Sequence, residues 1–305
     1  MTAVYSKAAS FLFFILLGYL CKRFKVVGPE AAGALAKINL TVSLPCLVII
    51  NFSGSSIDFS LAVLILIAIV EGLVLCFVNS LMSRGKSDRK RTAYIIGGTG
   101  YNIGSFTTPF VQSFLPPLGT VAVCVYDTGN AVISTGGSAA INSVILKKDG
   151  ESFQPLQLIK KLFSSPCIDT YFIMFLLSAA GISIPTPVLD LIRPAANANV
   201  FIAMFMLGLM FHIEFRKEYL LQIVSILGVR FALGAAFAAA AWFLLPFDLP
   251  VRQAMVLVPF SPVTSAAPAF VLLNDGDEGL AGCVNSISII CSLVILSAMI
   301  GIMGI

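Results

Sequence analysis

The sequence predicts an all-α integral membrane protein with about ten transmembrane helices, arranged as two inverted five-helix repeats. Its 305 residues are 58% hydrophobic and only 11% charged, with a mean hydropathy of +0.98. This composition is far more apolar than that of a soluble globular domain. A membrane-spanning helix needs roughly 20 mostly apolar residues, and the chain divides into about ten such stretches separated by short polar joints. Nearly the whole chain is therefore expected to lie in the bilayer.

The ten stretches form two groups of five on either side of a charged segment. They are expected at 6–21, 31–52, 58–81, 92–114, 118–146, 166–183, 188–212, 219–245, 250–273 and 278–305. Residues 1–146 then make the first repeat, 147–165 a cytoplasmic linker and 166–305 the second repeat. The first stretch leads into GYLCKRFK, which lacks a small-residue cleavage pattern, so it is interpreted as a membrane helix rather than a signal peptide.

Basic residues alternate from joint to joint along the chain. Most of the 19 Lys and Arg residues lie in the odd-numbered joints. Cytoplasmic loops collect Lys and Arg, so these joints are predicted in the cytoplasm and both termini on the other side of the inner or plasma membrane. The joint NDGDE before the last stretch has no basic residue and is placed by parity.

Five helices per half is an odd number, so related halves must be inverted relative to each other. Inverted repeats are common in secondary transporters, whose substrate site lies near the midplane where the repeats meet. Sliding the chain by 159 positions without a gap aligns identical or similar residues of the two halves. The aligned pairs are Asn102 with Ser261, Pro109 with Pro268, and Cys124 with Cys283.

Two apolar stretches, one in each half, carry residues that weaken helices. GGTGYNIGSFTTPFVQSF (97–114) has four glycines and a proline, and VPFSPVTSAAPAF (258–270) has three prolines. Non-helical backbone at membrane depth is tolerated only where protein or a water-filled cavity covers it. Close helix packing explains either stretch alone, but the matched pair favours crossing broken helices, the fourth and ninth, whose ends attract ions.

Three motifs in the sequence are similar to those of a known family. YNIGSFTTPFVQSF has Asn, then Gly, then Pro; INLTVSLPCLVIINFS has Asn39 and Pro45; and VLVPFSPVTSAAPAFVLLND is the third. They resemble the fourth, second and ninth segments of the auxin efflux carrier family. The segment 147–165 is too short for the long central loop of plant exporters, so the resemblance is to the short prokaryotic branch, which includes malate and malonate permeases. It implies a ten-helix fold with a scaffold and a mobile part, and transport of a small organic anion such as a dicarboxylate or an auxin-like acid.

Polar residues of the breaks and of neighbouring stretches are the candidate substrate-binding residues. They are Asn39, Asn102, Gly104, Asp127, Asn130, Ser261, Thr264 and Asn285. The residues expected to shape helix breaks are Pro45, Pro109 and Pro268. Asn197 and Asn199, before an apolar run, are expected to line the cavity or to cap a helix.

Ionisable residues inside a membrane are functional candidates by default, so Asp127 and Glu71 are candidates for ion coupling. The alternative for Asp127 is a structural carboxylate that is hydrogen-bonded to a neighbouring helix. The alternative for Glu71 is an internal ion pair with Lys37 or Arg230, and either base is also a candidate for binding an anion. His212 is expected at the membrane interface.

The predicted function is a secondary carrier, or permease, that works by alternating access. The main alternative is a sodium-coupled symporter of the bile-acid type, which shares the crossover fold. No G-x-x-x-x-G-K-[ST] loop supports ATP-driven transport, and a single histidine without H-E-x-x-H argues against an intramembrane enzyme. A receptor or sensor would not need paired breaks.

The seven cysteines include no C-x-x-C pair and are interpreted as small buried hydrophobes rather than metal ligands or disulfides. No cofactor and no nucleic acid are expected; the expected partners are an organic anion and the lipid bilayer, with a homodimer left open.

Overall fold

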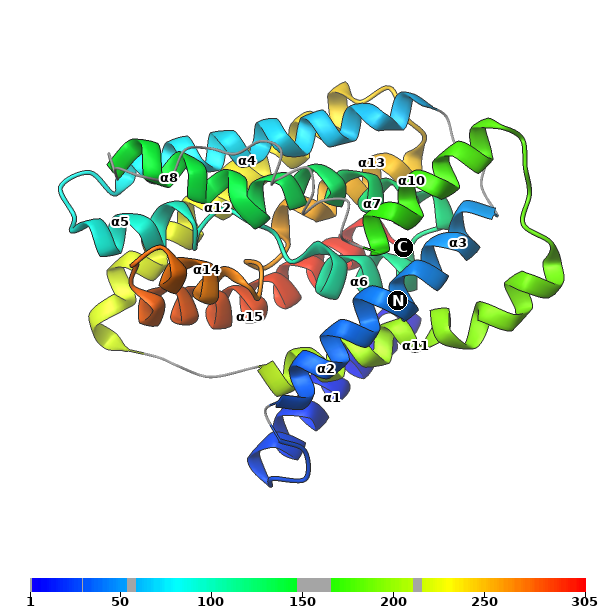
Figure 1. Cartoon of the computed structure of the whole chain (residues 1–305), viewed down its shortest axis with the longest axis horizontal. Helices are drawn as coiled ribbons and strands as arrows, with labels where there is room; N and C mark the ends of the chain where they lie inside the picture. The colour runs from blue at the N-terminus through cyan, green and yellow to red at the C-terminus, as the bar shows by residue number, and fades with distance from the viewer. Residues whose placement is uncertain (1, 29, 54–58, 147–165, 211–215) are drawn as a thin grey trace.

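Helices make up the regular structure of this protein (Figure 1). The computed structural model describes residues 2–28, 30–53, 59–146, 166–210 and 216–305. In this part of the chain, the β-type contact is a single antiparallel bridge between Tyr101 and Val263. The predicted linker 147–165 and His212 lie outside the described residues.

Helical segments lie over each of the predicted apolar stretches. In the first half they are α1 (Thr2–Arg23), α2 (Glu30–Ile38), α3 (Leu44–Ser53), α4 (Val63–Met82), α5 (Asp88–Ile95), α6 (Thr108–Phe114), α7 (Pro117–Val132) and α8 (Ser138–Leu146). In the second half they are α10 (Pro166–Ala179), α11 (Thr186–Met210), α12 (Leu220–Leu244), α13 (Leu249–Leu257), α14 (Ala267–Leu273) and α15 (Glu278–Met303).

Several helical spans are long and apolar enough to cross a membrane. Among the described residues there are five: Glu30–Ser53, Ser60–Met82, Thr186–Met210, Lys217–Leu244 and Glu278–Met303. They make this a multi-pass membrane protein by length and composition. The count of ten spans, the division into two repeats and the inversion of one repeat stay predictions.

The second stretch is helical without a break. A π-helical turn, Asn39–Ser43, connects α2 to α3, and the Leu44 N–H donates to the Asn39 carbonyl. The sequence predicted that Pro45 shapes a helix break. In the structure Pro45 is the second residue of α3, and the helix continues through it. A proline ring inside a helix clashes with the carbonyl four residues earlier, and the wider π turn directly before Pro45 relieves that crowding.

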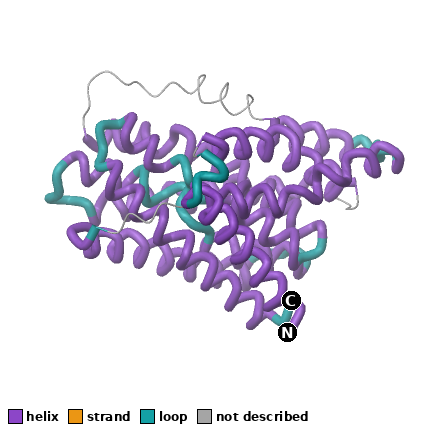
Figure 2. Tube along the Cα trace, turned by 90° about the horizontal axis from the view of Figure 1, so that it is seen from below, coloured by secondary structure: helices purple, strands orange, loops and turns teal. Residues whose placement is uncertain are grey.

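The helices pack in two groups. Helices α1, α2, α3, α10 and α11 pack mainly with one another, and α4, α5, α7, α8 and α12 to α15 form the second group. In Figure 1, α1, α2 and α11 lie at the bottom of the view, below the second group. Figure 2 shows loop segments in the interior of the bundle as well as at its ends. The contacts of α6 and α3 with both α11 and α7 join the two groups.

The joints before α5, α12 and α15 meet at one end of the molecule. The Asp277 N–H donates to the Arg89 carbonyl (3.0 Å), and the Tyr219 hydroxyl donates to the Asp277 carboxylate (3.0 Å). Asp277 also caps α15 by accepting from the Leu280 N–H (3.1 Å). The joint NDGDE therefore lies at the same end as the basic joint before α5, which agrees with its placement by parity.

This shared end predicts which positions react with a reagent from the same side of the membrane. In a background without native cysteines, Arg84→Cys and Glu278→Cys are expected to react with a membrane-impermeant maleimide from one face. Asp248→Cys, just before α13, is expected to react from the other face, because the 25 residues of α12 separate it from Tyr219. Labelling of oriented vesicles measures this, and reaction of Arg84→Cys and Glu278→Cys from opposite faces would contradict the arrangement.

Candidate functional site

Two unwound segments, one in each half, meet and hydrogen-bond to each other. The first follows α5 and ends where a π turn begins at Ile103; the second separates a 3-10 turn, Val258–Phe260, from α14. The Asn102 N–H donates to the Pro262 carbonyl (2.9 Å), and the Thr264 N–H donates to the Gly100 carbonyl (3.1 Å). Backbone groups freed by unwinding need partners in a membrane interior, and here the two segments partly satisfy each other.

The register of this crossover differs from the register of the sequence alignment. An offset of 162 residues relates residue 102 to 264 and residue 100 to 262. Under this offset, each of the two hydrogen bonds maps onto the other. The gap-free sequence alignment used an offset of 159. Any antiparallel pair has a local two-fold relation, so this geometry alone leaves the inverted repeat a prediction.

Pro109 and Pro268 are each the second residue of a helix, α6 or α14. Pro268 lies in a first helical turn, where the missing N–H has no intrahelical partner. Pro109 instead follows the π turn Ile103–Thr107, as Pro45 follows the π turn before α3. The unwound residues therefore lie before these prolines, where glycines 97, 98 and 100 occupy the first segment.

Asn130 on α7 binds both backbone groups of Tyr101. Its Oδ1 accepts from the Tyr101 N–H and its Nδ2 donates to the Tyr101 carbonyl, both at 3.0 Å. The same Nδ2 donates to Asp127 Oδ1 (2.9 Å). Asn130 is 5% exposed, so its side chain supports the first unwound segment from inside the protein.

Two residues of α15 do the same for Val263 in the second unwound segment. The Val263 N–H donates to Ser288 Oγ (3.0 Å), and Asn285 Nδ2 donates to the Val263 carbonyl (3.0 Å). Asn285 also donates to the Thr264 carbonyl (3.1 Å). Each segment thus has an asparagine from the second helix after it, α7 or α15, that fixes its irregular backbone.

The guanidinium of Arg230, on α12, lies at the centre of the crossover. Its Nη1 and Nη2 donate to carbonyl oxygens of both unwound segments at 2.9 to 3.3 Å: Gly98, Thr99, Gly100, Ser261 and Pro262. The guanidinium carbon also lies 4.0 Å from the centre of the Tyr101 ring. Arg230 is fully buried. A buried charge is tolerated only with such compensation from hydrogen bonds and an aromatic face.

Glu71 is connected to Arg230 through Tyr101 and not by an ion pair. The Tyr101 and Tyr126 hydroxyls donate to its two carboxylate oxygens, at 2.6 and 2.5 Å. Among the described ion pairs none joins Glu71 to Arg230 or Lys37, and Lys37 is exposed. The ion pair that was one alternative for Glu71 is therefore replaced by a bridge, because Tyr101 offers its ring face to the cation and its hydroxyl to the carboxylate.

Asp127 has a carboxylate oxygen that faces Gly104. A Cβ on Gly104 would lie 3.5 Å from Asp127 Oδ2, 3.5 Å from Leu44 and 3.8 Å from Leu40. Asp127 is partly exposed, and the hydrogen bond that it accepts from Asn130 uses the other oxygen. Of the two carboxylates considered for coupling, Glu71 and Asp127, Asp127 thus has an oxygen that a ligand or an ion can reach.

The remaining predicted residues lie at different distances from the crossover. Ser261 is fully buried, and its Oγ donates to the Val258 carbonyl and lies 2.5 Å from Thr107 Oγ1. Asn39 lies in the other helix group, where its Oδ1 accepts from Asn199 Nδ2 (3.2 Å). The structure therefore brings Asn102, Asn130, Ser261, Thr264 and Asn285 together, with Gly104 and Asp127 beside them, and holds Asn39 by its contact with Asn199.

A cavity of about 390 Å³ lies beside the second unwound segment. Its lining includes Arg216, Ser265, Pro268, Glu278, Asn285 and Ser286. Arg216 and Glu278 lie at the end of the molecule where the joints meet. The cavity therefore connects polar groups next to the crossover with that end.

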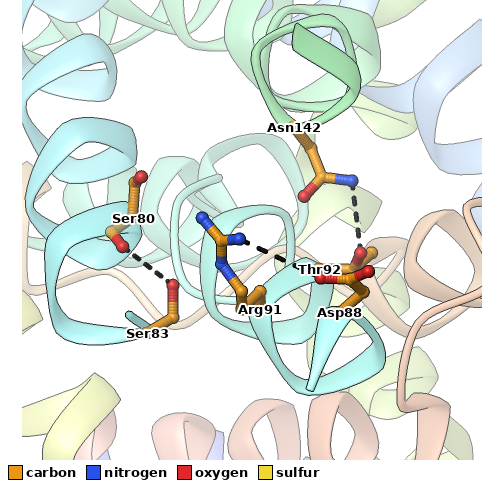
Figure 3. Close-up of polar contacts among 6 residues, drawn as sticks. All are labelled: Ser80, Ser83, Asp88, Arg91, Thr92 and Asn142. Carbon is orange, nitrogen blue, oxygen red and sulfur yellow. Dashed lines mark hydrogen bonds and ion pairs between the residues drawn. The ribbon is translucent and has the colours of Figure 1, made fainter. Parts of the chain in front are cut away.

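A separate polar cluster lies near the ends of α4, α5 and α8. Figure 3 shows Ser80, Ser83, Asp88, Arg91, Thr92 and Asn142. Asn142 Nδ2 donates to Thr92 Oγ1 (3.2 Å), and Arg91 lies 3.9 Å from Asp88 one turn earlier. The Asn142–Thr92 contact joins α8 to α5 and the Arg91–Asp88 contact lies within α5, both away from the crossover.

Sequence reasoning assigned no site role to Tyr101, Tyr126 and Ser288 and treated Arg230 as an ion-pair partner for Glu71 or as an anion-binding base. A charge inside an apolar stretch is the signal that marks Arg230. Nothing in the local sequence marks the tyrosines, because their role depends on the position of Glu71 30 and 55 residues away. Among the described residues, no group of three or more His, Cys, Asp or Glu could hold a metal ion.

Comparison with known proteins adds one finding. No family model matches the chain. A protein of Methanothermobacter thermautotrophicus named "Uncharacterized transporter" is 23% identical over 298 residues, which cover 94% of each chain. This chain is similar to a transporter over nearly its whole length. At this identity, the similarity supports a transporter role and argues only weakly against an enzyme.

Proposed function

We propose that this protein is a secondary transporter that moves a small organic anion across the membrane by alternating access. The observation that carries the proposal is the pair of hydrogen bonds between two unwound segments, from Asn102 to Pro262 and from Thr264 to Gly100. Irregular backbone at membrane depth is typical of transporters, whose crossing broken helices form the substrate site. The proposal includes ten membrane spans in two inverted five-helix repeats. The fourth and ninth spans, which contain the two unwound segments, cross each other.

Partial charges at the crossover favour an anionic substrate. In each half the unwound segment is followed by a helical segment whose N-terminal N–H groups carry a partial positive charge. Asn102 Nδ2 is buried without a hydrogen-bond partner in the described structure and can donate to a ligand. A dicarboxylate or an auxin-like acid, as in the auxin efflux carrier family that the motifs resemble, has the carboxylate for these donors.

The two helix groups support a moving and a static part. The crossover and its supporting residues belong to the group of α4, α5, α7, α8 and α12 to α15, and α1, α2, α3, α10 and α11 form the other. Movement of the group that holds the crossover against the group of α1, α2, α3, α10 and α11 would expose the crossover alternately to the two sides. Asp127, at the border with Leu40 and Leu44 of the latter group, is the coupling residue in this proposal.

Substitution of Asp127 tests this function. Proteoliposomes that contain Asp127→Asn are expected to take up labelled malate, malonate or indole-3-acetate at least about tenfold more slowly under a pH gradient, because the variant keeps the shape of the side chain and loses its proton exchange. Asn102→Ala is expected to weaken binding, seen as a raised KM.

The matched control is Asp190→Asn, since Asp190 is exposed and pairs with Arg193 one turn away. Its uptake is expected to equal that of the wild type. Unchanged uptake in both Asp127→Asn and Asn102→Ala would contradict a substrate site at the crossover.

A further inference from the structure

The place where a coupling cation would bind in a crossing-helix carrier is filled by a side chain. In such carriers, unwound backbone carbonyls and half-helix C-terminal ends coordinate the coupling ion. Here five carbonyl oxygens from both unwound segments, at residues 98–100 and 261–262, accept hydrogen bonds from Arg230.

We propose that Arg230 is the resident cation of the crossover and that transport is therefore independent of sodium. The proposal rests on the proposed transporter function and specifies its ion coupling. A guanidinium carries one fixed positive charge and several N–H donors in a planar fork, so it can bind several carbonyl oxygens at once. Because these oxygens are turned toward Arg230, they are not free to replace the water shell of a metal ion.

The charge balance around Arg230 supports the same conclusion. Tyr101 covers the guanidinium with its ring and donates its hydroxyl to Glu71, which also accepts from Tyr126. Glu71 is 1% exposed and Arg230 is fully buried. One buried positive and one buried negative charge thus already balance, and a second cation at the same place would be unbalanced in a low-dielectric interior.

Arg230 also connects the two unwound segments to one helix. Its side chain comes from α12, and it binds carbonyls of the first segment at Gly98 and of the second at Pro262. An exchangeable ion would tie the segments only when bound. A covalently attached cation keeps them together in every transport state, with or without substrate.

Removal of the guanidinium is expected to create a site for an external cation. In Arg230→Ala, the carbonyls lose their donors while Glu71 keeps its negative charge, so the crossover needs a positive ion. The melting temperature of purified Arg230→Ala is expected to rise by about 3 °C or more in guanidinium or sodium chloride compared with choline chloride at equal ionic strength. All three salts are used at concentrations too low for guanidinium to denature the protein. The wild type and the exposed control Arg193→Ala are expected to melt at the same temperature in all of them.

Transport measurements complete the test. Wild-type uptake is expected to be equal in sodium and choline buffers, and Arg230→Lys, which keeps a charge, is expected to retain sodium independence with slower uptake. Saturable sodium dependence of wild-type uptake would overturn the proposal, and so would a melting temperature of Arg230→Ala that is equal in all three salts.

These measurements keep the two proposals apart. If no anion is transported by a folded wild-type protein, the proposed function fails, and the melting temperatures still decide the role of Arg230. If an anion is transported only with sodium, the function stands and the resident cation is wrong. Should Arg230→Ala not fold, sodium dependence of uptake and of melting in the wild type and in Arg230→Lys decides by itself.

Discussion

Replacement of Asn130 by alanine is expected to lower the stability of the folded protein by about 2–4 kcal/mol. The substitution leaves both the N–H and the carbonyl of Tyr101 without partners, and each unpaired buried polar group costs about 1–3 kcal/mol. Water cannot replace the lost side chain easily, because Tyr101 is 4% exposed. A lower midpoint of thermal unfolding in detergent measures the loss.

The exposed Asn197 on α11 provides the matched control for Asn130. Asn197→Ala is expected to change stability by less than about 0.5 kcal/mol, as is usual for surface substitutions. Asn130→Asp should destabilise at least as much as Asn130→Ala, because a buried carboxylate would face the Tyr101 carbonyl and the Asp127 carboxylate where Nδ2 now donates. Equal melting of Asn130→Ala and wild type would show that the unwound segment does not depend on this side chain.

Substitution of Gly208 is expected to separate α1 from α11 and to cost about 2–3 kcal/mol. A Cβ at Gly208 would lie 2.0 Å from the Ile15 carbonyl oxygen, and a Cβ at Gly18 would lie 2.1 Å from that of Phe205. Each glycine therefore packs against the backbone of the other helix, and even one methyl group forces a backbone shift. Gly208→Ala should lower the midpoint of thermal unfolding.

Gly228 is the control for this effect because it lies in a membrane helix of similar length with open space around it. A Cβ there meets no atom within 4 Å. Gly228→Ala is expected to be neutral or to stabilise by up to about 1 kcal/mol, since alanine is the better helix former. Equal melting of Gly208→Ala and Gly228→Ala would contradict the close contact of α1 with α11.

The geometry distinguishes two carboxylates that the sequence could not distinguish. Glu71 and Asp127 are both acidic residues in apolar stretches, so both were candidates for coupling. Glu71 has both oxygens occupied by tyrosine hydroxyls and is buried, whereas Asp127 is partly exposed beside Gly104. We therefore propose a coupling role for Asp127 and a structural role for Glu71.

The sequence by itself determined the class of protein and the position of its irregular segments. Composition and hydropathy predict helices that span a membrane, since the bilayer interior tolerates no unpaired backbone. Gly100, Asn102 and Pro262 marked the unwound segments, because glycine and proline weaken helices by purely local effects. Asn130 and Asn285 could be named as candidates because a polar side chain in an apolar stretch needs a partner.

Only the tertiary structure decided what each of these residues contacts. Arg230 lies 132 residues from Gly98 and 31 from Ser261, and no local pattern predicts that one guanidinium binds both segments. A bridge through Tyr101 takes the place of the ion pair that was one alternative for Glu71, and Pro45 lies inside a helix directly after a π turn. Local propensity determines where a helix can unwind, whereas the packing of distant helices determines which groups satisfy the backbone that unwinding leaves free.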